Sequence, residues 1–170
     1  MKIDRYNELM LSTKDVAYRV ALSLVGNAAD AEDVTQDIYE MVWRRRDEIL
    51  SMGNPRAYVL RSVRNLCLDR FRAVDRHDRS LTAIGHASER SADYSAQYDA
   101  RDQVRIVERV IAQLPERQRL AIHLRDVEQW DIDEIAEVTQ SDETSVRMNL
   151  SRARRTVREE LLKIMNYGVQ

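Results

Sequence analysis

The stretch that decides the fold is Asp131-Ile-Asp-Glu-Ile-Ala-Glu-Val-Thr-Gln-Ser-Asp-Glu-Thr-Ser-Val-Arg-Met-Asn-Leu-Ser-Arg-Ala-Arg-Arg155. It predicts two helices joined by a short turn. The second helix is strongly basic: between Thr144 and Arg158 there are five arginines and no acidic residue, although the whole chain has a net charge of −2. Exposed helices usually mix both signs. The pattern therefore predicts a helix that meets a phosphate backbone. An amphipathic hairpin with a solvated basic face is the alternative.

The two predicted helices have the pattern of a helix-turn-helix. Ile132, Ile135 and Ala136 give the first helix a buried side, and Asp142 is the expected N-cap of the second. The core stripe of the second helix repeats at helical spacing at Val146, Leu150, Ala153, Val157 and Leu161. Its opposite side presents Thr144, Arg147, Met148, Ser151, Arg152 and Arg155. The first turns of this side are expected to reach base edges, and the later arginines to hold phosphates.

Composition supports an all-α protein. The 170 residues include only 4 glycines and 2 prolines, so few residues interrupt helices. The single cysteine, Cys67, lies in an apolar helical pattern and is expected in the core. We find no apolar run of the ~18 residues that a membrane span needs, and no signal-peptide core, so we expect a soluble cytoplasmic protein.

The sequence offers little for catalysis. The three histidines, His77, His86 and His123, are scattered, and no phosphate loop, zinc spacing or nucleophile constellation is present. We therefore expect no enzyme activity, no cofactor and no metal site.

Three zones divide the chain. Residues 1–75 and 101–170 carry helical patterns and are predicted to form two helical domains. Residues 76–100 are poor in large apolar groups and are expected to be a flexible linker, whose 25 residues span roughly 80 Å when fully extended. The two domains could therefore reach separate sites on one large partner. The alternative is a loop folded back between two packed domains.

Charge is uneven within the first zone. Residues 1–43 contain four Lys or Arg and eight Asp or Glu, whereas residues 44–72 contain eight Arg and three acids. This polarity is typical of a domain that meets a protein on one face and nucleic acid on another. Solvated helix faces are the alternative.

Local signals mark several helix ends. Gly26 and Asn27 are expected to end the first helix, and Asp30 to cap the second. The segment Gly53-Asn-Pro55 predicts a turn. Pro115 is expected to be the first residue of a later helix.

Both domains resemble a known family, the bacterial sigma factors of the extracytoplasmic-function (ECF) group. In the C-terminal zone the resemblance is carried by Leu114-Pro-Glu-Arg-Gln-Arg119, Leu124-Arg-Asp-Val-Glu-Gln-Trp-Asp-Ile-Asp-Glu-Ile-Ala-Glu-Val138 and Ser145-Val-Arg-Met-Asn-Leu-Ser-Arg-Ala-Arg154. In the N-terminal zone it is carried by Ala31-Glu-Asp-Val-Thr-Gln-Asp-Ile-Tyr-Glu-Met-Val-Trp43 and Asn54-Pro-Arg-Ala-Tyr-Val-Leu-Arg-Ser-Val-Arg-Asn-Leu-Cys-Leu-Asp-Arg-Phe-Arg72. A helix-turn-helix alone would be far less specific than both domains in this order.

The resemblance implies a transcription initiation factor that binds core RNA polymerase and promoter DNA, commonly regulated by an anti-sigma factor. It places polymerase contacts at Asp33, Gln36, Asp37 and Trp43, for which an acidic solvated face with a buried Trp is the alternative. It places contacts to the minus-10 element at Arg61, Arg64 and Asn65. Contacts to the minus-35 element fall at Arg125, Arg147, Met148, Ser151 and Arg152.

The loop of residues 51–56 is implied to form, with Asn65, a pocket for a flipped base. Asp69 and Arg72 are held as structural residues that brace this loop. A stand-alone helix-turn-helix regulator is the alternative function for the whole chain, although it would leave residues 30–72 unexplained.

Three departures from the family pattern bear on the C-terminal domain. Gln129 and Gln140 stand where the family usually has glycine, so the two turns are expected to differ in geometry. Trp130 replaces the usual leucine and is expected to be a larger core anchor. Asn149 replaces a usual basic residue, which leaves the base preference at the minus-35 element open.

Overall fold

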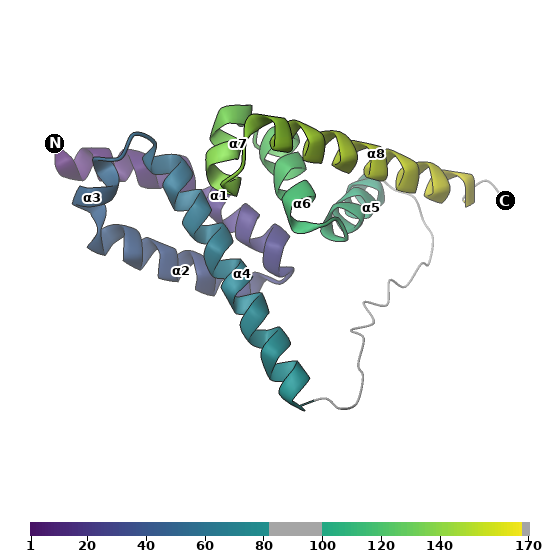
Figure 1. Cartoon of the computed structure of the whole chain (residues 1–170), viewed down its shortest axis with the longest axis horizontal. Helices are drawn as coiled ribbons and strands as arrows, with labels where there is room; N and C mark the ends of the chain where they lie inside the picture. The colour runs from purple at the N-terminus through teal and green to yellow at the C-terminus, as the bar shows by residue number, and fades with distance from the viewer. Residues whose placement is uncertain (82–99, 168–170) are drawn as a thin grey trace.

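The computed structural model describes residues 1–81 and 100–167. All regular structure in these two ranges is helical, which confirms the predicted all-α class (Figure 1). Most of the predicted linker lies outside the described residues. The elements are α1 (Lys2–Val25), α2 (Ala28–Arg44), α3 (Arg46–Leu50), α4 (Pro55–Leu81), α5 (Ala100–Ala112), α6 (Glu116–Ile122), the π-helix η1 (His123–Val127), α7 (Ile132–Thr139) and α8 (Glu143–Tyr167).

The first unit comprises α1–α4, with α1 packed against both α2 and α4. Gly26 ends α1 as predicted: its φ of 82° is left-handed, and its N–H donates to the carbonyl of Leu22. The predicted cap of α2 is wrong. Asn27 is the N-cap, and its side chain accepts a hydrogen bond from the backbone N–H of Asp30. Asp30 lies instead in the first turn, where its negative charge is favourable to the helix dipole.

Helix α4 begins at the predicted turn and runs past residue 75. The Asn54 side chain accepts a hydrogen bond of 3.0 Å from the N–H of Ala57, which caps the helix. Cys67 is fully buried in the core as predicted, and burial raises the pKa of its thiol to about 12. The prediction that Asp69 and Arg72 brace the loop before α4 is wrong. They pair with each other at 3.9 Å, about 20 Å along the helix from the loop at 1.5 Å per residue.

The second unit comprises α5–α8 and contains the predicted helix-turn-helix, formed by α7 and α8. Asp142 caps α8 as predicted, since its Oδ1 accepts a hydrogen bond of 2.7 Å from the N–H of Ser145. That backbone hydrogen bond also lowers the pKa of the Asp142 carboxyl. Pro115 is shifted by one position from its prediction. It occupies the N-cap position, and α6 begins at Glu116.

The two units pack against each other, with α4 beside α7 and α1 beside α6 (Figure 1). One cluster of buried side chains runs through both units. It includes Val63 and Cys67 of α4 together with Leu124, Trp130 and Ile135 of the second unit. Trp130 is only 1% exposed, which confirms it as a core anchor. Of the two arrangements considered from the sequence, the structure has the packed one. No described helix is long and apolar enough to cross a membrane.

The two glutamines at family glycine positions take the backbone conformation that glycine favours. Gln129 has a φ of 59° and Gln140 a φ of 52°, both left-handed. A difference from the family's turns stays a prediction. The glutamines bear the steric cost of the left-handed conformation, about 1–2 kcal/mol for an L-residue.

Gln140→Gly is expected to raise the free energy of unfolding by about 0.5–1 kcal/mol, because glycine removes this steric cost but loses more chain entropy on folding. Urea denaturation followed by circular dichroism measures the change. The matched control is Gln36→Gly, at an exposed position within α2, which should lower stability by about 1 kcal/mol. Equal destabilisation by both substitutions would contradict the strain at residue 140.

Candidate nucleic-acid interface

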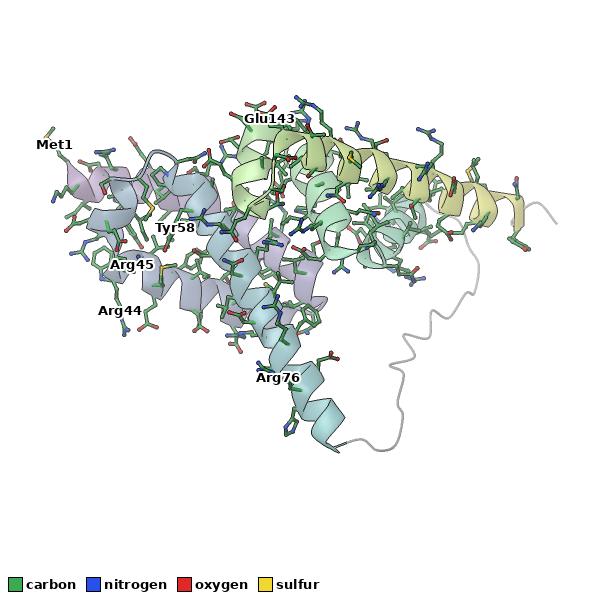
Figure 2. All side chains as sticks on the ribbon, in the orientation of Figure 1. Met1, Arg44, Arg45, Tyr58, Arg76 and Glu143 are labelled. Carbon is green, nitrogen blue, oxygen red and sulfur yellow. The ribbon has the colours of Figure 1, made fainter. Side chains whose placement is uncertain are left out.

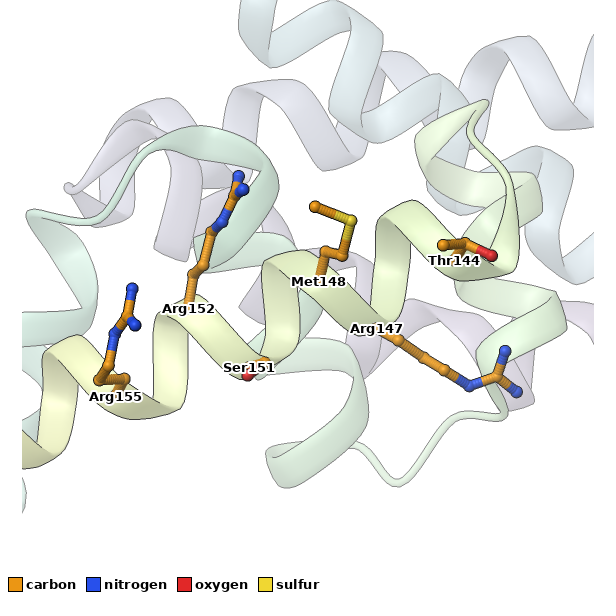
Figure 3. Close-up of a pocket in the computed structure, with 6 residues that line it drawn as sticks. All are labelled: Thr144, Arg147, Met148, Ser151, Arg152 and Arg155. Carbon is orange, nitrogen blue, oxygen red and sulfur yellow. The ribbon is translucent and has the colours of Figure 1, made fainter.

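The exposed side of α8 forms an open groove. Its lining is the set predicted from the helix pattern: Thr144, Arg147, Met148, Ser151, Arg152 and Arg155. Figure 3 shows Met148, Arg152 and Arg155 extending from the same side of α8, with Arg147 extending in another direction. The opposite side of α8 is held by burial of Val146, Leu150 and Ala153. Packing therefore fixes which side of the helix faces outward.

The groove has the chemical groups that read a DNA major groove. Guanidinium groups can bond guanine edges or phosphates in bidentate fashion, and an apolar side chain can contact a thymine methyl group. Met148 is 48% exposed, and it lies among arginines. Arg147 pairs with Glu143 at 3.3 Å within the helix. Among the described residues, Arg152 and Arg155 form no ion pair, so both can donate hydrogen bonds to a phosphate.

Two other arginines of the second unit make intramolecular contacts. Arg154 of α8 makes a bidentate ion pair with Asp126, with distances of 3.0 and 2.6 Å, and so holds α8 against η1. Arg125, predicted to contact DNA, donates a hydrogen bond of 2.8 Å to the carbonyl of Trp130 and lies 3.7 Å from Asp131. Its guanidinium thus stabilises the turn before α7. Its predicted DNA contact stays a prediction.

In the first unit the predicted minus-10 residues lie in different environments. Asn65 is exposed on α4. Arg61 lies with its guanidinium 5.3 Å from the ring centre of Tyr58. Arg64 is only 7% exposed, and it forms a bidentate ion pair with Glu116 of the second unit, with distances of 2.5 and 3.2 Å. In this conformation Arg64 cannot touch DNA.

A cluster of arginines around Tyr58 was not predicted from the sequence. The Tyr58 hydroxyl accepts a hydrogen bond of 2.9 Å from Arg45, while Arg61 lies over its ring. Figure 2 shows Arg44 and Arg45 in a different part of the molecule from Glu143, where α8 begins. An aromatic ring beside arginines suits a stacked, unpaired base. The signal available in the sequence was one tyrosine within the arginine-rich residues 44–72.

The predicted polymerase residues lie on the surface of α2. Asp33 and Asp37 are exposed, and both face Arg70 of α4, at 4.0 and 2.6 Å. Gln36 is exposed between them. Trp43 is 48% exposed, and its ring meets Tyr6 edge-on at 5.1 Å. The alternative of a buried Trp is therefore wrong.

Contacts between the units bring together residues that the sequence did not single out. Arg19 of α1 makes a bidentate ion pair with Glu128, with distances of 2.6 and 2.8 Å. The side chain of Glu128 is only 7% exposed, and Nε2 of His123 lies 3.3 Å from it. The hydrogen bond from Arg19 lowers the pKa of Glu128, and burial lowers the pKa of His123. A single sequence, read by itself, contains no signal for such long-range pairs.

Fold and site define a helical protein of two packed units, the second a helix-turn-helix with an open basic groove. The family model of sigma-70 region 2 matches residues 9–77, and that of sigma-70 region 4 matches residues 105–157. Together the two matches cover most of the chain in the order of its two units. The chain belongs to the sigma-70 family of RNA polymerase sigma factors, in the ECF group.

Individual proteins agree with this assignment. The chain is 30% identical over 166 residues to ECF RNA polymerase sigma factor SigJ of Mycobacterium tuberculosis, covering 92% of this chain and 50% of SigJ. It is 22% identical to ECF RNA polymerase sigma factor SigW of Bacillus subtilis, covering 93% of this chain and 89% of SigW. It is also similar to the sigma factor RpoE from Bartonella quintana, solved with the anti-sigma factor NepR. The TM-score is 0.76 at 25% identity, over 93% of this chain and 96% of RpoE. The chain spans less than two thirds of the first curated relatives it matches.

The cluster of Arg19, His123 and Glu128 predicts acid sensitivity. A folded pKa below the unfolded value means that the folded state binds fewer protons, so stability is full above the unfolded pKa and falls as the pH drops below it. In the unfolded chain, His123 takes up its proton below about pH 6.5 and Glu128 below about pH 4.3, and each protonation lowers the free energy of unfolding. The free energy of unfolding should therefore fall between pH 7.5 and 4, with each group contributing at most about 1.4 kcal/mol per pH unit.

Urea denaturation across this pH range measures the fall. His123→Gln should flatten the curve between pH 7 and 5 and leave the lower part in place. His77→Gln, which changes an exposed histidine of α4, is the matched control. An unchanged slope in His123→Gln would exclude the buried imidazole as its source.

Proposed function

We propose that the chain is a transcription initiation factor that binds core RNA polymerase, directs it to specific promoters and helps to melt the minus-10 region. One observation carries the proposal: matches to sigma-70 regions 2 and 4 fall, in order, on two separate helical units of one chain. In this role the chain has no catalysis of its own, and it acts in the cytoplasm with polymerase. Among the described residues no group of ligating side chains is arranged to hold a metal ion.

We assign polymerase binding to the exposed surface of α2. Asp33, Gln36 and Asp37 offer an acidic, hydrogen-bonding face, and Trp43 adds a large apolar ring. Half-exposed tryptophans are frequent binding hot spots, because they bury much area at little entropic cost. Arg46 lies 4.4 Å over the Trp43 ring and holds it in place.

Residues 1–75 also contain the residues proposed to contact the minus-10 element. Melted DNA presents unpaired bases, which proteins bind by stacking on aromatic rings and by arginine contacts to the backbone. Tyr58 with Arg45 and Arg61 supplies both kinds of group, and the exposed Asn65 supplies a hydrogen-bonding amide. Arg64 can join them only after its pair with Glu116 opens.

Residues 101–170 contain the residues proposed to contact the minus-35 element, with α8 entering the major groove. Thr144 and Arg147 lie in its first turns, where base edges are reached, and Arg152 and Arg155 are placed to hold phosphates. The chain is near neutral overall, and affinity for DNA depends steeply on the number of phosphates neutralised. Tight promoter binding therefore needs contacts to both elements at the same time, made by a chain that is bound to polymerase.

An anti-sigma factor is the proposed regulatory partner. The likeness to RpoE, which was solved with the anti-sigma factor NepR, supports this assignment. A stand-alone helix-turn-helix regulator would use the second unit alone, and would give the α2 surface and the Tyr58 cluster no role.

In a reconstituted assay, the full chain added to core polymerase should produce transcripts from specific start sites on a library of genomic promoters. Core polymerase alone is the control. Tight operator binding by the free chain without any gain in transcription would favour the stand-alone regulator and defeat the proposal.

Substitutions should distinguish the proposed contacts to the minus-35 element from those to the minus-10 element. Arg152→Ala should lower transcription from promoters that depend on the minus-35 element by about fivefold to 150-fold, the effect of losing about 1–3 kcal/mol of base or phosphate contact. Asn65→Ala should leave duplex binding intact and reduce open-complex formation, measured by permanganate reactivity of unpaired thymines. Lys163→Ala, near the end of α8, is the control. Equal losses of duplex binding in the two test variants would contradict this division.

A further inference from the structure

Met148 differs in its surroundings from the other five methionines of the chain. Three of those five are partly buried against the larger core cluster: Met10, Met41 and Met52. Met1 and Met165 are exposed, but they lie at the N-terminus and in the last turns of α8. Met148 alone is both exposed, at 48%, and part of the basic groove of α8.

The groove places hydrogen-bond donors beside the Met148 thioether. Arg152 follows Met148 by four residues, so the two side chains are neighbours on one side of the helix. Figure 3 shows both extending from the same side of α8. The Met148 sulfur is only a weak acceptor, so it does not occupy the N–H groups of the guanidinium. Since Arg152 forms no ion pair among the described residues, these N–H groups are available to a stronger acceptor placed next to them.

Oxidation turns a thioether into such an acceptor. Hydrogen peroxide transfers one oxygen atom to the sulfur: a sulfur lone pair attacks one peroxide oxygen, the O–O bond breaks, and the proton of the attacked oxygen leaves with the departing hydroxide as water. The sulfur loses two electrons, and the peroxide gains them. The product, methionine sulfoxide, carries a polar oxygen, and methionine sulfoxide reductases convert it back to the thioether.

We propose that Met148 is a redox-sensitive modification site, at which oxidation by a peroxide to the sulfoxide weakens the contact of α8 with DNA. Two effects act in the same direction. A polar oxygen replaces an apolar contact to a thymine methyl group. The sulfoxide oxygen also accepts a hydrogen bond from Arg152 that a phosphate or a base would otherwise receive. The oxidation itself follows from exposure, and only its effect on promoter use rests on the proposed function.

The first measurement is the order in which the methionines react. The full chain is treated with hydrogen peroxide, mass spectrometry of its peptides follows the sulfoxide at each methionine, and circular dichroism monitors the helices. Met148 should react well before the three methionines of the core cluster, because its sulfur is open to solvent. Cys67 should stay reduced, since burial raises the pKa of its thiol to about 12 and leaves little thiolate. Equal rates at Met148 and at the core methionines would overturn the proposal.

The second measurement is DNA affinity, followed by fluorescence anisotropy of a labelled duplex of random sequence at low ionic strength, where phosphate contacts are strongest. Oxidation should weaken binding by the unsubstituted chain about tenfold, the effect of losing one hydrogen bond to a charged group. The slope of log affinity against log salt should fall in magnitude by about 0.9, the loss of one phosphate contact. Methionine sulfoxide reductases should restore both values. Absence of duplex binding before treatment, or unchanged affinity once Met148 is fully oxidised, overturns the proposal.

Two leucine substitutions assign the effect to one sulfur. Each variant is compared with its own untreated sample, so that a change in its starting affinity does not enter the comparison. Met148→Leu keeps an apolar side chain that peroxide does not oxidise, and its binding should not respond to the treatment. Met165→Leu removes the other exposed methionine of α8, and it should lose affinity as the unsubstituted chain does. Equal losses in the two variants would exclude Met148 as the site.

Transcription separates the modification from the proposed function. Only the chain is treated, and the peroxide is removed before core polymerase is added. Oxidation should reduce transcripts from promoters that depend on the minus-35 element in the unsubstituted chain, but not in Met148→Leu. Unchanged transcription by a chain whose duplex affinity has fallen would refute the control of promoter use and leave the modification site standing. Absence of transcripts with every untreated chain would refute the proposed function, and the duplex measurements would still decide the site.

Discussion

The arrangement of the two units depends on the ion pair between Arg64 and Glu116. Arg64 is almost fully buried, and a buried guanidinium without a carboxylate partner costs several kcal/mol. Removing Glu116 would leave that cation in the shared core, so this contact is one of those that couple the two units energetically. Arg64 is also one of the residues predicted to contact the minus-10 element, and that contact stays a prediction.

Charge is unevenly distributed in a chain that is near neutral overall. Net charge is −2, but the positive charge is concentrated on α8 and on residues 44–72. Of the eight acidic residues in residues 1–43, five lie on α2. In the second unit, Glu116 and Glu128 pair with arginines of the first unit. This distribution supports the proposed DNA contacts on α8 and residues 44–72 and the proposed polymerase contacts on α2.

Local features of the fold were predictable from sequence, and long-range ones were not. The helix-turn-helix, the Asp142 cap and the outward side of α8 follow from periodicity and capping chemistry, which act within a few residues. The cap of α2 was assigned to Asp30 instead of Asn27 because both residue types favour that position. The pairs of Arg64 with Glu116 and Arg19 with Glu128 join residues that are far apart in sequence. The glutamines at 129 and 140 show that tertiary packing can impose a left-handed backbone without glycine.

The central proposal is that the two helical units together direct core RNA polymerase to specific promoters. Mapping the transcripts that core polymerase makes with and without the chain tests it most directly. The account predicts new start sites that share one sequence motif upstream and appear only when the chain is present. The same start sites from core polymerase alone would contradict it.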